Sequence, residues 1–220
     1  MTQWSHSSLK MFDTCKRQYH EIRVLKNFKR EENEQSIYGN NLHKASELYV
    51  KSDEPLPDSF AFMQPILDTL MTKTGTFFAE HEMALDVELD PCGWKDKQAW
   101  VRGIADLLIV DNASRRAWCV DYKTGSDRYA DTSQLDLMSL LIFQNFPAVL
   151  EVKGALLFVL KNNMIKHTVK REDKDALWWK YRERIAAIDA AMQNGVWNPT
   201  QSGLCKKYCS VTSCEFNGRH

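Results

Sequence analysis

The 220-residue sequence has no net charge and no long hydrophobic run. Lys and Arg together number 29, and Asp and Glu together also number 29. This balance excludes a protein that coats nucleic acid with uniformly basic surface. The longest apolar runs, Leu137 to Phe143 and Ala155 to Leu160, are too short to span a bilayer. The polar first 20 residues also lack the apolar core of a secretory signal. We therefore expect a soluble, cytoplasmic protein with no membrane partner.

Internal repeats and low-complexity segments are also absent, whereas the components of a globular core are present. Hydrophobic residues make up 44% of the chain and aromatic residues 11%, as in folded rather than disordered chains. A chain of this length can bury about 70% of the surface that it exposes when unfolded. We expect one domain with a helical part at 1–80, a sheet core at 81–170, and a C-terminal helix with a cysteine-rich tail at 171–220.

The spacing of apolar residues predicts the order of helices and strands. Helical spacing predicts helices at 9–25, 39–50, within 60–78, at 133–143 and at 173–194. Alternation predicts strands at 80–89, 100–110, 117–122, 152–160 and 164–169. Helices followed by three strands, a helix, two strands and a further helix indicate an α/β fold with a mixed sheet.

Two of the predicted strands carry acidic residues in apolar surroundings. Asp106 lies within the apolar run 103–110, and Asp121 precedes Lys123 by two residues at the end of the next strand. Alternate residues of a strand face the same way, so Asp121 and Lys123 share a face. A buried carboxylate usually has a partner, often a cation. Two converging carboxylates could bind Mg²⁺ or Mn²⁺, and a strand-end ion pair with Lys123 is the alternative.

The order of five motifs resembles that of the RecB-like branch of the PD-(D/E)XK nuclease superfamily, which includes AddB and the CRISPR-associated RecB-like iron–sulfur exonucleases. The similar segments are Ser5–Leu9 with Cys15–Tyr19, Gly39–His43 with Glu47, Gly103–Asp106, Asp121–Gly125, and Gln134–Leu135. The sequence departs from the family pattern at Lys16, where the family has proline, and at Met138, where it has tyrosine. The resemblance implies a restriction-endonuclease-like core with a central mixed sheet flanked by helices, and an N-terminal helical region packed with the C-terminal tail.

The resemblance also implies a role for each motif residue. His43, Asp106, Asp121 and the main-chain carbonyl of Tyr122 would bind the divalent metal, Mg²⁺ or Mn²⁺. Lys123 would position the attacking water or stabilise the charged transition state, and Gln134 would contact the substrate or the region of the lysine. Without the resemblance, the favoured explanation of His43 is a helix-face residue in a packed region or one that pairs with Glu47.

Three of the six cysteines lie close together near the C-terminus. Cys205, Cys209 and Cys214 form a C-x₃-C-x₄-C run, and three such ligands need a fourth to complete a zinc or iron–sulfur site. The resemblance implies that Cys15 is the fourth ligand and that the site holds a 4Fe–4S cluster. The alternatives are structural zinc, disulfides formed after loss of a cluster, and no metal at all. Cys92, in a turn, and Cys119, within a strand, are interpreted as residues that bind no metal, because a free cysteine is often just a small buried residue.

Basic residues are concentrated toward the two ends of the chain and could contact a nucleic-acid backbone. In the first helix, Lys16 and Arg17 could bind phosphates, with Tyr19 beside them. Trp4, Tyr19 or Trp178 could stack on unpaired bases. The alternative is that the charges form a solvated helix face and that the aromatic residues belong to the core.

These features together predict a metal-dependent deoxyribonuclease that hydrolyses phosphodiester bonds. We expect an exonuclease on single-stranded DNA or DNA ends that acts in recombination, repair, phage replication or CRISPR adaptation. Because helicase motifs are absent from the sequence, unwinding would need a helicase or a recombination or adaptation protein as partner. The alternatives are an accessory module that binds DNA ends through a vestigial site, and a structure-selective endonuclease.

Overall fold

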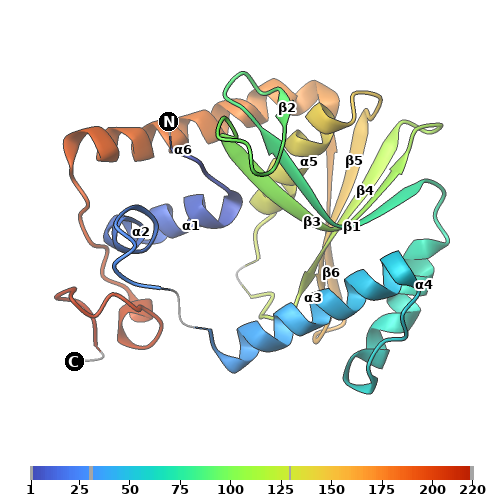
Figure 1. The fold of residues 1–220 in the computed structure, drawn as a ribbon, viewed down its shortest axis with the longest axis horizontal. Helices are drawn as coiled ribbons and strands as arrows, with labels where there is room; N and C mark the ends of the chain where they lie inside the picture. The colour runs from blue at the N-terminus through green and yellow to red at the C-terminus, as the bar shows by residue number, and fades with distance from the viewer. Residues whose placement is uncertain (1, 30–31, 129, 219–220) are drawn as a thin grey trace. The chain divides into compact units, whose positions relative to one another are not determined.

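A computed structural model describes residues 2–29, 32–128 and 130–218 (Figure 1). The chain divides into two compact units. The larger unit is Asn33–Trp178, and the smaller unit combines Met1–Glu32 with Trp179–His220. In the part of the chain that the structure describes, no helix is both long enough and apolar enough to cross a membrane.

The larger unit is built on a six-stranded sheet in the order β2-β1-β3-β4-β5-β6 (Figure 1). Only β4 and β5 pair in parallel, and the helix α5 (Ser133–Asn145) connects them. All other neighbours are antiparallel, so the sheet is mixed. The strands are β1 (Thr76–Leu85), β2 (Pro91–Cys92), β3 (Val101–Asp111), β4 (Arg116–Lys123), β5 (Glu151–Phe158) and β6 (Asn163–Lys170).

Helices cover both faces of this sheet. On one face, α5 packs so closely that a Cβ atom added at Gly103 would lie 2.5 Å from Leu141 and 2.9 Å from Met138. The residue that departs from the family pattern, Met138, is therefore a buried packing residue. On the other face, Leu42, Met63 and Leu67 pack with residues of β3 and β4. The elements there are α3 (Glu34–Ser52), the 3₁₀ helix η2 (Asp58–Met63) and α4 (Gln64–Met71). The predicted α/β class, with a mixed sheet flanked by helices, is confirmed.

The smaller unit brings the N-terminal helices together with the C-terminal tail, as expected. Arg184 forms an ion pair with Asp13, and the indole of Trp197 stacks on the rings of Tyr19 and His20. Its elements are α1 (His6–Thr14), α2 (Lys16–Tyr19), the π-helix η1 (His20–Val24), the part of α6 (Lys174–Asn194) after Trp178, and the 3₁₀ helix η4 (Gly203–Lys206). A further 3₁₀ turn, η3 (Arg171–Asp173), precedes α6 in the larger unit.

The first predicted helix is interrupted at Cys15. This residue has an extended backbone, and its thiol accepts a hydrogen bond from the N–H of Gln18 as the N-cap of α2. The helix predicted at 39–50 begins earlier, at Glu34, because Asn33 and Ser36 form a capping box that satisfies its first N–H groups. Apolar periodicity detects neither feature, because both depend on local bonds of polar side chains.

The boundary between the third helix and the first strand also differs from the prediction. The helix α4 ends at Met71, whereas a helix was predicted within 60–78. The strand β1 covers Thr76–Leu85 rather than 80–89. Gly75 lies between them with φ of 137°, a conformation that side chains rarely adopt. This glycine ends the helical segment and allows the strand to begin four residues earlier.

Candidate active site

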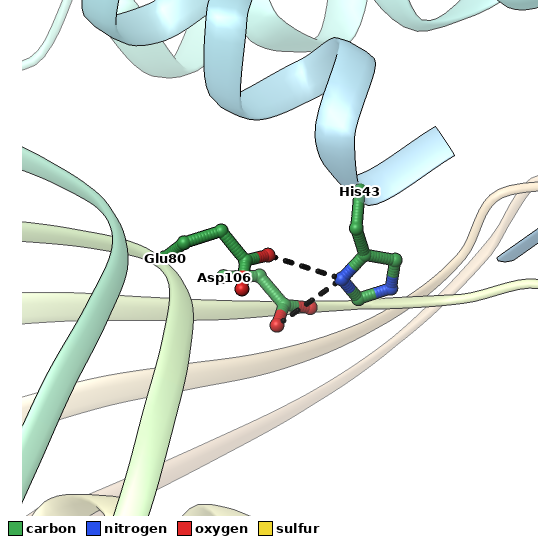
Figure 2. A group of neighbouring side chains, drawn as sticks. All are labelled: His43, Glu80 and Asp106. Carbon is green, nitrogen blue, oxygen red and sulfur yellow. Dashed lines mark hydrogen bonds and ion pairs between the residues drawn. The ribbon is translucent and has the colours of Figure 1, made fainter. Parts of the chain in front are cut away.

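Three side chains from separate elements meet at one point of the larger unit. His43 extends from α3 toward the sheet, where Glu80 of β1 and Asp106 of β3 direct their carboxylates at its imidazole (Figure 2). Nδ1 of His43 lies 3.3 Å from Oε1 of Glu80 and 3.4 Å from Oδ1 of Asp106. Among the described residues, this is the only set of three or more His, Cys, Asp or Glu ligand atoms that all lie within 4.8 Å of one another.

The register of β1 and β3 places the two carboxylates side by side. Ala79 pairs with Leu107 and His81 with Ala105, so Glu80 stands opposite Asp106. Like charges at opposite positions of antiparallel strands repel each other. A cation between them, whether an imidazolium or a metal ion, removes this repulsion. The pairing of β1 and β3 therefore brings two negative charges together, and a cation at this point is favoured.

The backbone of Glu80 has an unusual conformation for a strand residue. Its φ is 46°, in the left-handed region that costs about 1–3 kcal/mol for a residue other than glycine. The side-chain alternation of β1 breaks here. Phe77 packs on the face of α3 and α4, whereas His81 contacts Phe146 at the end of α5. A regular strand would place Phe77 and His81 on the same face.

The imidazole of His43 is surrounded by oxygen acceptors on both sides. Its Nε2 lies 3.1 Å from the main-chain oxygen of Tyr122, opposite the two carboxylates at Nδ1. Burial disfavours the charged ring, but the hydrogen bonds and charges of Asp106 and Glu80 outweigh it and raise the pKa of His43 to about 10. At neutral pH the ring is therefore an imidazolium that donates hydrogen bonds from both nitrogens.

A second group adjoins this one at the end of β4. Nζ of Lys123 lies 2.7 Å from Oδ2 of Asp121 and donates a hydrogen bond of 2.8 Å to Oε1 of Gln134 on α5. The amide nitrogen of Gln134 donates to Oδ1 of Asp121, so the three side chains form a closed triangle. Burial, followed by the charge of Asp106, raises the pKa of Asp121, while Lys123 opposes the shift. The influence of Asp106 on that pKa places the two groups within electrostatic reach of each other.

The structure brings most of the predicted catalytic and metal residues to this region, with one addition and one difference. His43, Asp106 and the carbonyl of Tyr122 lie together, and the N–H of Tyr122 donates to Oδ2 of Asp106 at 2.7 Å. Asp121 is not in the three-ligand set, because Lys123 and Gln134 hold its carboxylate. Glu80 is in the set but was not predicted. The sequence signal for Glu80 was an acidic residue at the start of an apolar predicted strand. Regular alternation of side chains gave no reason to expect that this residue faces α3.

The donor set suits a hard divalent cation. Two carboxylates, a main-chain carbonyl and an imidazole nitrogen are ligands that Mg²⁺ and Mn²⁺ accept. The two carboxylates already converge on Nδ1 of His43, so a cation could replace the proton there without moving the sheet. The Tyr122 carbonyl faces Nε2 on the other side of the ring and would reach the same cation only if the imidazole turned. The residues therefore fit the metal that the family resemblance implies.

The four cysteines assigned to a cluster lie in the smaller unit, and all are free thiols. The sulfur of Cys15 accepts an N–H from Thr200 at 3.4 Å, and that of Cys205 lies 3.8 Å from the carbonyl oxygen of the same Thr200. Burial raises the pKa of Cys214, and the charge of Cys15 adds to the shift. Cys209 lies in the same tail, where Asn217 donates to its carbonyl at 3.0 Å. These four residues belong to one unit but form no set as close as that around His43 within the described chain.

The aromatic residues suggested for base stacking are buried. Tyr19 is 1% exposed and contacts Phe12 and Trp197, so its ring is a packing element rather than a DNA contact. Trp4 and Trp178 are buried as well. The spacing of these residues in the sequence does not reveal that each is surrounded by apolar side chains of its own unit, which is why burial differs from the suggested exposure to DNA. Lys16 lies over the ring of Phe12, and Arg17 pairs with Glu21.

Comparison with known proteins identifies the family. The model of the PD-(D/E)XK nuclease superfamily matches residues 63–214, which is more than half of the chain. The chain therefore belongs to this superfamily of metal-dependent nucleases, and its sheet is a restriction-endonuclease-like core.

Solved structures agree with this fold. A crystal structure of a protein from Eubacterium rectale, described as a "putative exonuclease", has a TM-score of 0.53 at 13% sequence identity. The match covers 93% of this chain and 86% of that one. The crystal structure of SSO0001 gives a TM-score of 0.44 at 12% identity, covering 85% of this chain and 76% of that one, and supports no further argument. No curated protein matches the chain.

Proposed function

We propose that this protein is a divalent-metal-dependent deoxyribonuclease of the RecB-like branch that hydrolyses phosphodiester bonds as an exonuclease on single-stranded DNA or DNA ends. The observation that carries the proposal is the pairing of two groups: the ligand set of His43, Glu80 and Asp106, and the adjoining triangle of Asp121, Lys123 and Gln134. Such an enzyme would serve recombination, repair, phage replication or CRISPR adaptation, with a helicase or another protein of those processes as partner.

The ligand set defines where the metal would bind. Glu80, Asp106 and His43 would hold Mg²⁺ or Mn²⁺, and the family resemblance adds Asp121 and the carbonyl of Tyr122 to this set. When bound, the ion would supply Lewis acidity to the scissile phosphate and lower the pKa of a water molecule. Before it binds, the proton shared by His43 and the two carboxylates keeps their atoms in place.

The triangle fixes the ammonium group of Lys123. An ammonium group has three N–H donors, and two of them face Asp121 and Gln134. The third is left for the attacking water or for a phosphate oxygen. Because Asp121 and Gln134 determine the direction of Nζ, they act as positioning residues for this lysine, and Lys123 stabilises the charge that develops on the phosphate.

We also propose that Cys15, Cys205, Cys209 and Cys214 hold a 4Fe–4S cluster. A single zinc ion needs its four thiolates at about 2.3 Å from one centre, whereas a cubane cluster holds each thiolate at a different iron and so spaces them more widely. The N–H groups that point at the sulfurs of Cys15 and Cys205 favour the cluster, because hydrogen bonds to the sulfurs are typical of iron–sulfur sites. Anaerobically purified protein should be brown with broad visible absorbance, and a colourless preparation with one zinc would reject the cluster.

The experiment that tests the proposed function is a cleavage assay in Mn²⁺ or Mg²⁺. Purified protein is incubated with end-labelled linear single strands, duplexes with blunt ends and closed single-stranded circles. We expect mononucleotides or short products from the linear strands and no cutting of circles. The Asp121→Ala variant should lose this activity and remain folded by circular dichroism.

Each other outcome has a definite meaning. Cutting of circles would replace the exonuclease with an endonuclease. Failure to cut any DNA in either metal would reject the nuclease and favour an accessory module that only binds DNA ends. Equal rates for wild type and Asp121→Ala would overturn the site assignment.

A further inference from the structure

The β5–β6 hairpin ends in a tip that the proposed chemistry does not use. The hairpin tip, residues 159–164, reads VLKNNM. The turn closes with a hydrogen bond from the N–H of Lys161 to the oxygen of Phe158, and Asn162 adopts a left-handed φ of 50°. The tip is thus a defined turn at the edge of the sheet, where β6 is the last strand.

The hairpin tip is joined to the catalytic strand. The N–H of Val159 donates to the main-chain oxygen of Lys123 at 3.0 Å, which extends the parallel pairing of β4 and β5 by one residue. Leu160 follows immediately, at the ~3.8 Å spacing of consecutive Cα atoms. On the other side of the turn, Asn163 donates to Asp127 in the segment after Lys123 at 2.7 Å. The tip therefore has a fixed position next to the main chain of Lys123.

Two apolar side chains of the hairpin tip are exposed. Leu160 is 50% exposed and Met164 is 46% exposed, on either side of the exposed Lys161. Residues 159–170 contain three lysines and no acidic residue. Lys161 and Lys166 form no ion pair with any residue that the structure describes. Apolar side chains at the apex of a basic hairpin complement a surface that has both stacked bases and phosphates.

We propose that the hairpin tip is a wedge that unstacks the terminal base pair of a duplex DNA end and so delivers one strand to Lys123. This inference rests on the proposed function and adds a substrate class to it. Leu and Met are among the side chains that proteins insert between base steps, and the cost of unstacking is a few kcal/mol per step. Lys161 would hold the adjoining phosphate.

The first test compares two substrates in the double variant L160S/M164S. Rates are measured on a blunt duplex end and on a single strand of the same sequence. We expect the ratio of duplex to single-strand cleavage to fall about tenfold, as the loss of a wedge would require. The matched control is L150S, because Leu150 flanks the opposite end of β5 and is 40% exposed. This control should leave the ratio unchanged.

The second test reads unstacking directly and needs no cleavage. A 2-aminopurine base in the terminal pair gains fluorescence when it is unstacked. In the Lys123→Ala background with Ca²⁺, the full chain should raise this fluorescence, and adding L160S/M164S should abolish the rise while adding L150S should not.

The two tests separate the inference from the proposed function. An unchanged cleavage ratio or an unchanged fluorescence rise in L160S/M164S would overturn the wedge, even if the protein is a nuclease. If the wild type cuts no DNA, the nuclease proposal fails, but the fluorescence experiment still decides whether the tip unstacks a DNA end. Single-strand cleavage and thermal melting of L160S/M164S show whether the variant is folded.

Discussion

The two candidate metal sites of this protein differ in what holds their ligands in place. The His43 group lies on the sheet of the larger unit, where strand register and the packed helix α3 hold the histidine and the two carboxylates in place. The cysteines lie in the smaller unit, where Cys15 separates α1 from α2 and the other three lie in the C-terminal tail, among polar contacts such as those of Thr200 and Asn217. The first site is organised before any metal arrives, whereas the cysteines form no comparably close set among the described residues.

This difference separates two uses of a metal. A catalytic ion can bind and leave while its ligands stay in the same positions. A sheet holds the ligands in these positions, so no binding free energy is used to order them. A structural cluster instead contributes folding free energy, because its ligands are brought together only when it binds. Removing a ligand should therefore impair chemistry at the first site and stability at the second.

The largest expected effect is on catalysis. Lys123→Ala should lower the rate of DNA cleavage about a thousandfold, the upper range for losing one donor to a developing charge. Its unfolding should remain cooperative, because the packed core of the larger unit is unchanged. Lys153→Ala is the matched control, since this exposed lysine lies on the neighbouring strand and forms only a 3.8 Å ion pair with Glu151. Equal cleavage by Lys123→Ala and Lys153→Ala would remove the lysine from the mechanism.

The proton at the His43 site predicts the next largest effect. A metal must displace this proton, because the pKa of His43 is raised to about 10. Apparent Mn²⁺ affinity should therefore increase about tenfold per pH unit, or about a hundredfold between pH 7 and 9. Calorimetry in buffers of different ionisation heat should show one proton released per ion. An affinity that does not change with pH would mean that His43 is neutral before binding.

The same shift links pH to the stability of the metal-free protein. A histidine whose pKa is raised on folding stabilises the folded state fully below its ordinary value of about 6.5. That contribution should decline as the pH rises toward 10, and Mn²⁺ should remove the decline by replacing the proton. Melting temperatures with and without Mn²⁺ across this range check both statements.

The cysteine set predicts an effect on stability confined to the smaller unit. Cys209→Ala should abolish visible absorbance and destabilise the tail by about 3 kcal/mol, because the cluster closes a loop from Cys15 to Cys205. Limited proteolysis should then cut within 196–218 while Mn²⁺ binding persists. Cys92→Ala, a thiol outside the set, serves as control. Loss of Mn²⁺ binding in Cys209→Ala would show that the two sites are not separable.

Sequence alone indicated a good part of the candidate active site. Alternation placed Asp121 and Lys123 on one face, and the structure pairs them at 2.7 Å. The resemblance pointed to His43, which lies beside Asp106. Both inferences work because period-two alternation and motif spacing describe regular elements well.

Glu80 and Cys15 show where such reasoning ends. The role of Glu80 depends on a left-handed residue within β1 that reverses the side-chain alternation. Cys15 interrupts a helix whose apolar spacing continues on both sides. Each feature is a single irregular backbone position held by tertiary contacts, so no periodic pattern in the sequence reports it.

The smallest predicted effect concerns the distance between α3 and the end of β4. A Cβ atom added at Gly39 would lie 3.2 Å from Oγ1 of Thr124, closer than an ordinary contact. Replacing a helical glycine with alanine stabilises a helix by about 0.5–1 kcal/mol, so Gly39→Ala should unfold at a slightly higher temperature.

The same methyl group pushes α3, and His43 with it, away from the strand end. Mn²⁺ affinity should therefore fall about threefold, a loss of about 0.65 kcal/mol of binding free energy, while the stability of the fold rises. Asn40→Ala is the control, because this exposed neighbour changes helix propensity without approaching Thr124. If both variants bind Mn²⁺ like the wild type, the catalytic ligands tolerate movement of α3, and the contrast with the cysteine tail is smaller than the hydrogen bonds suggest.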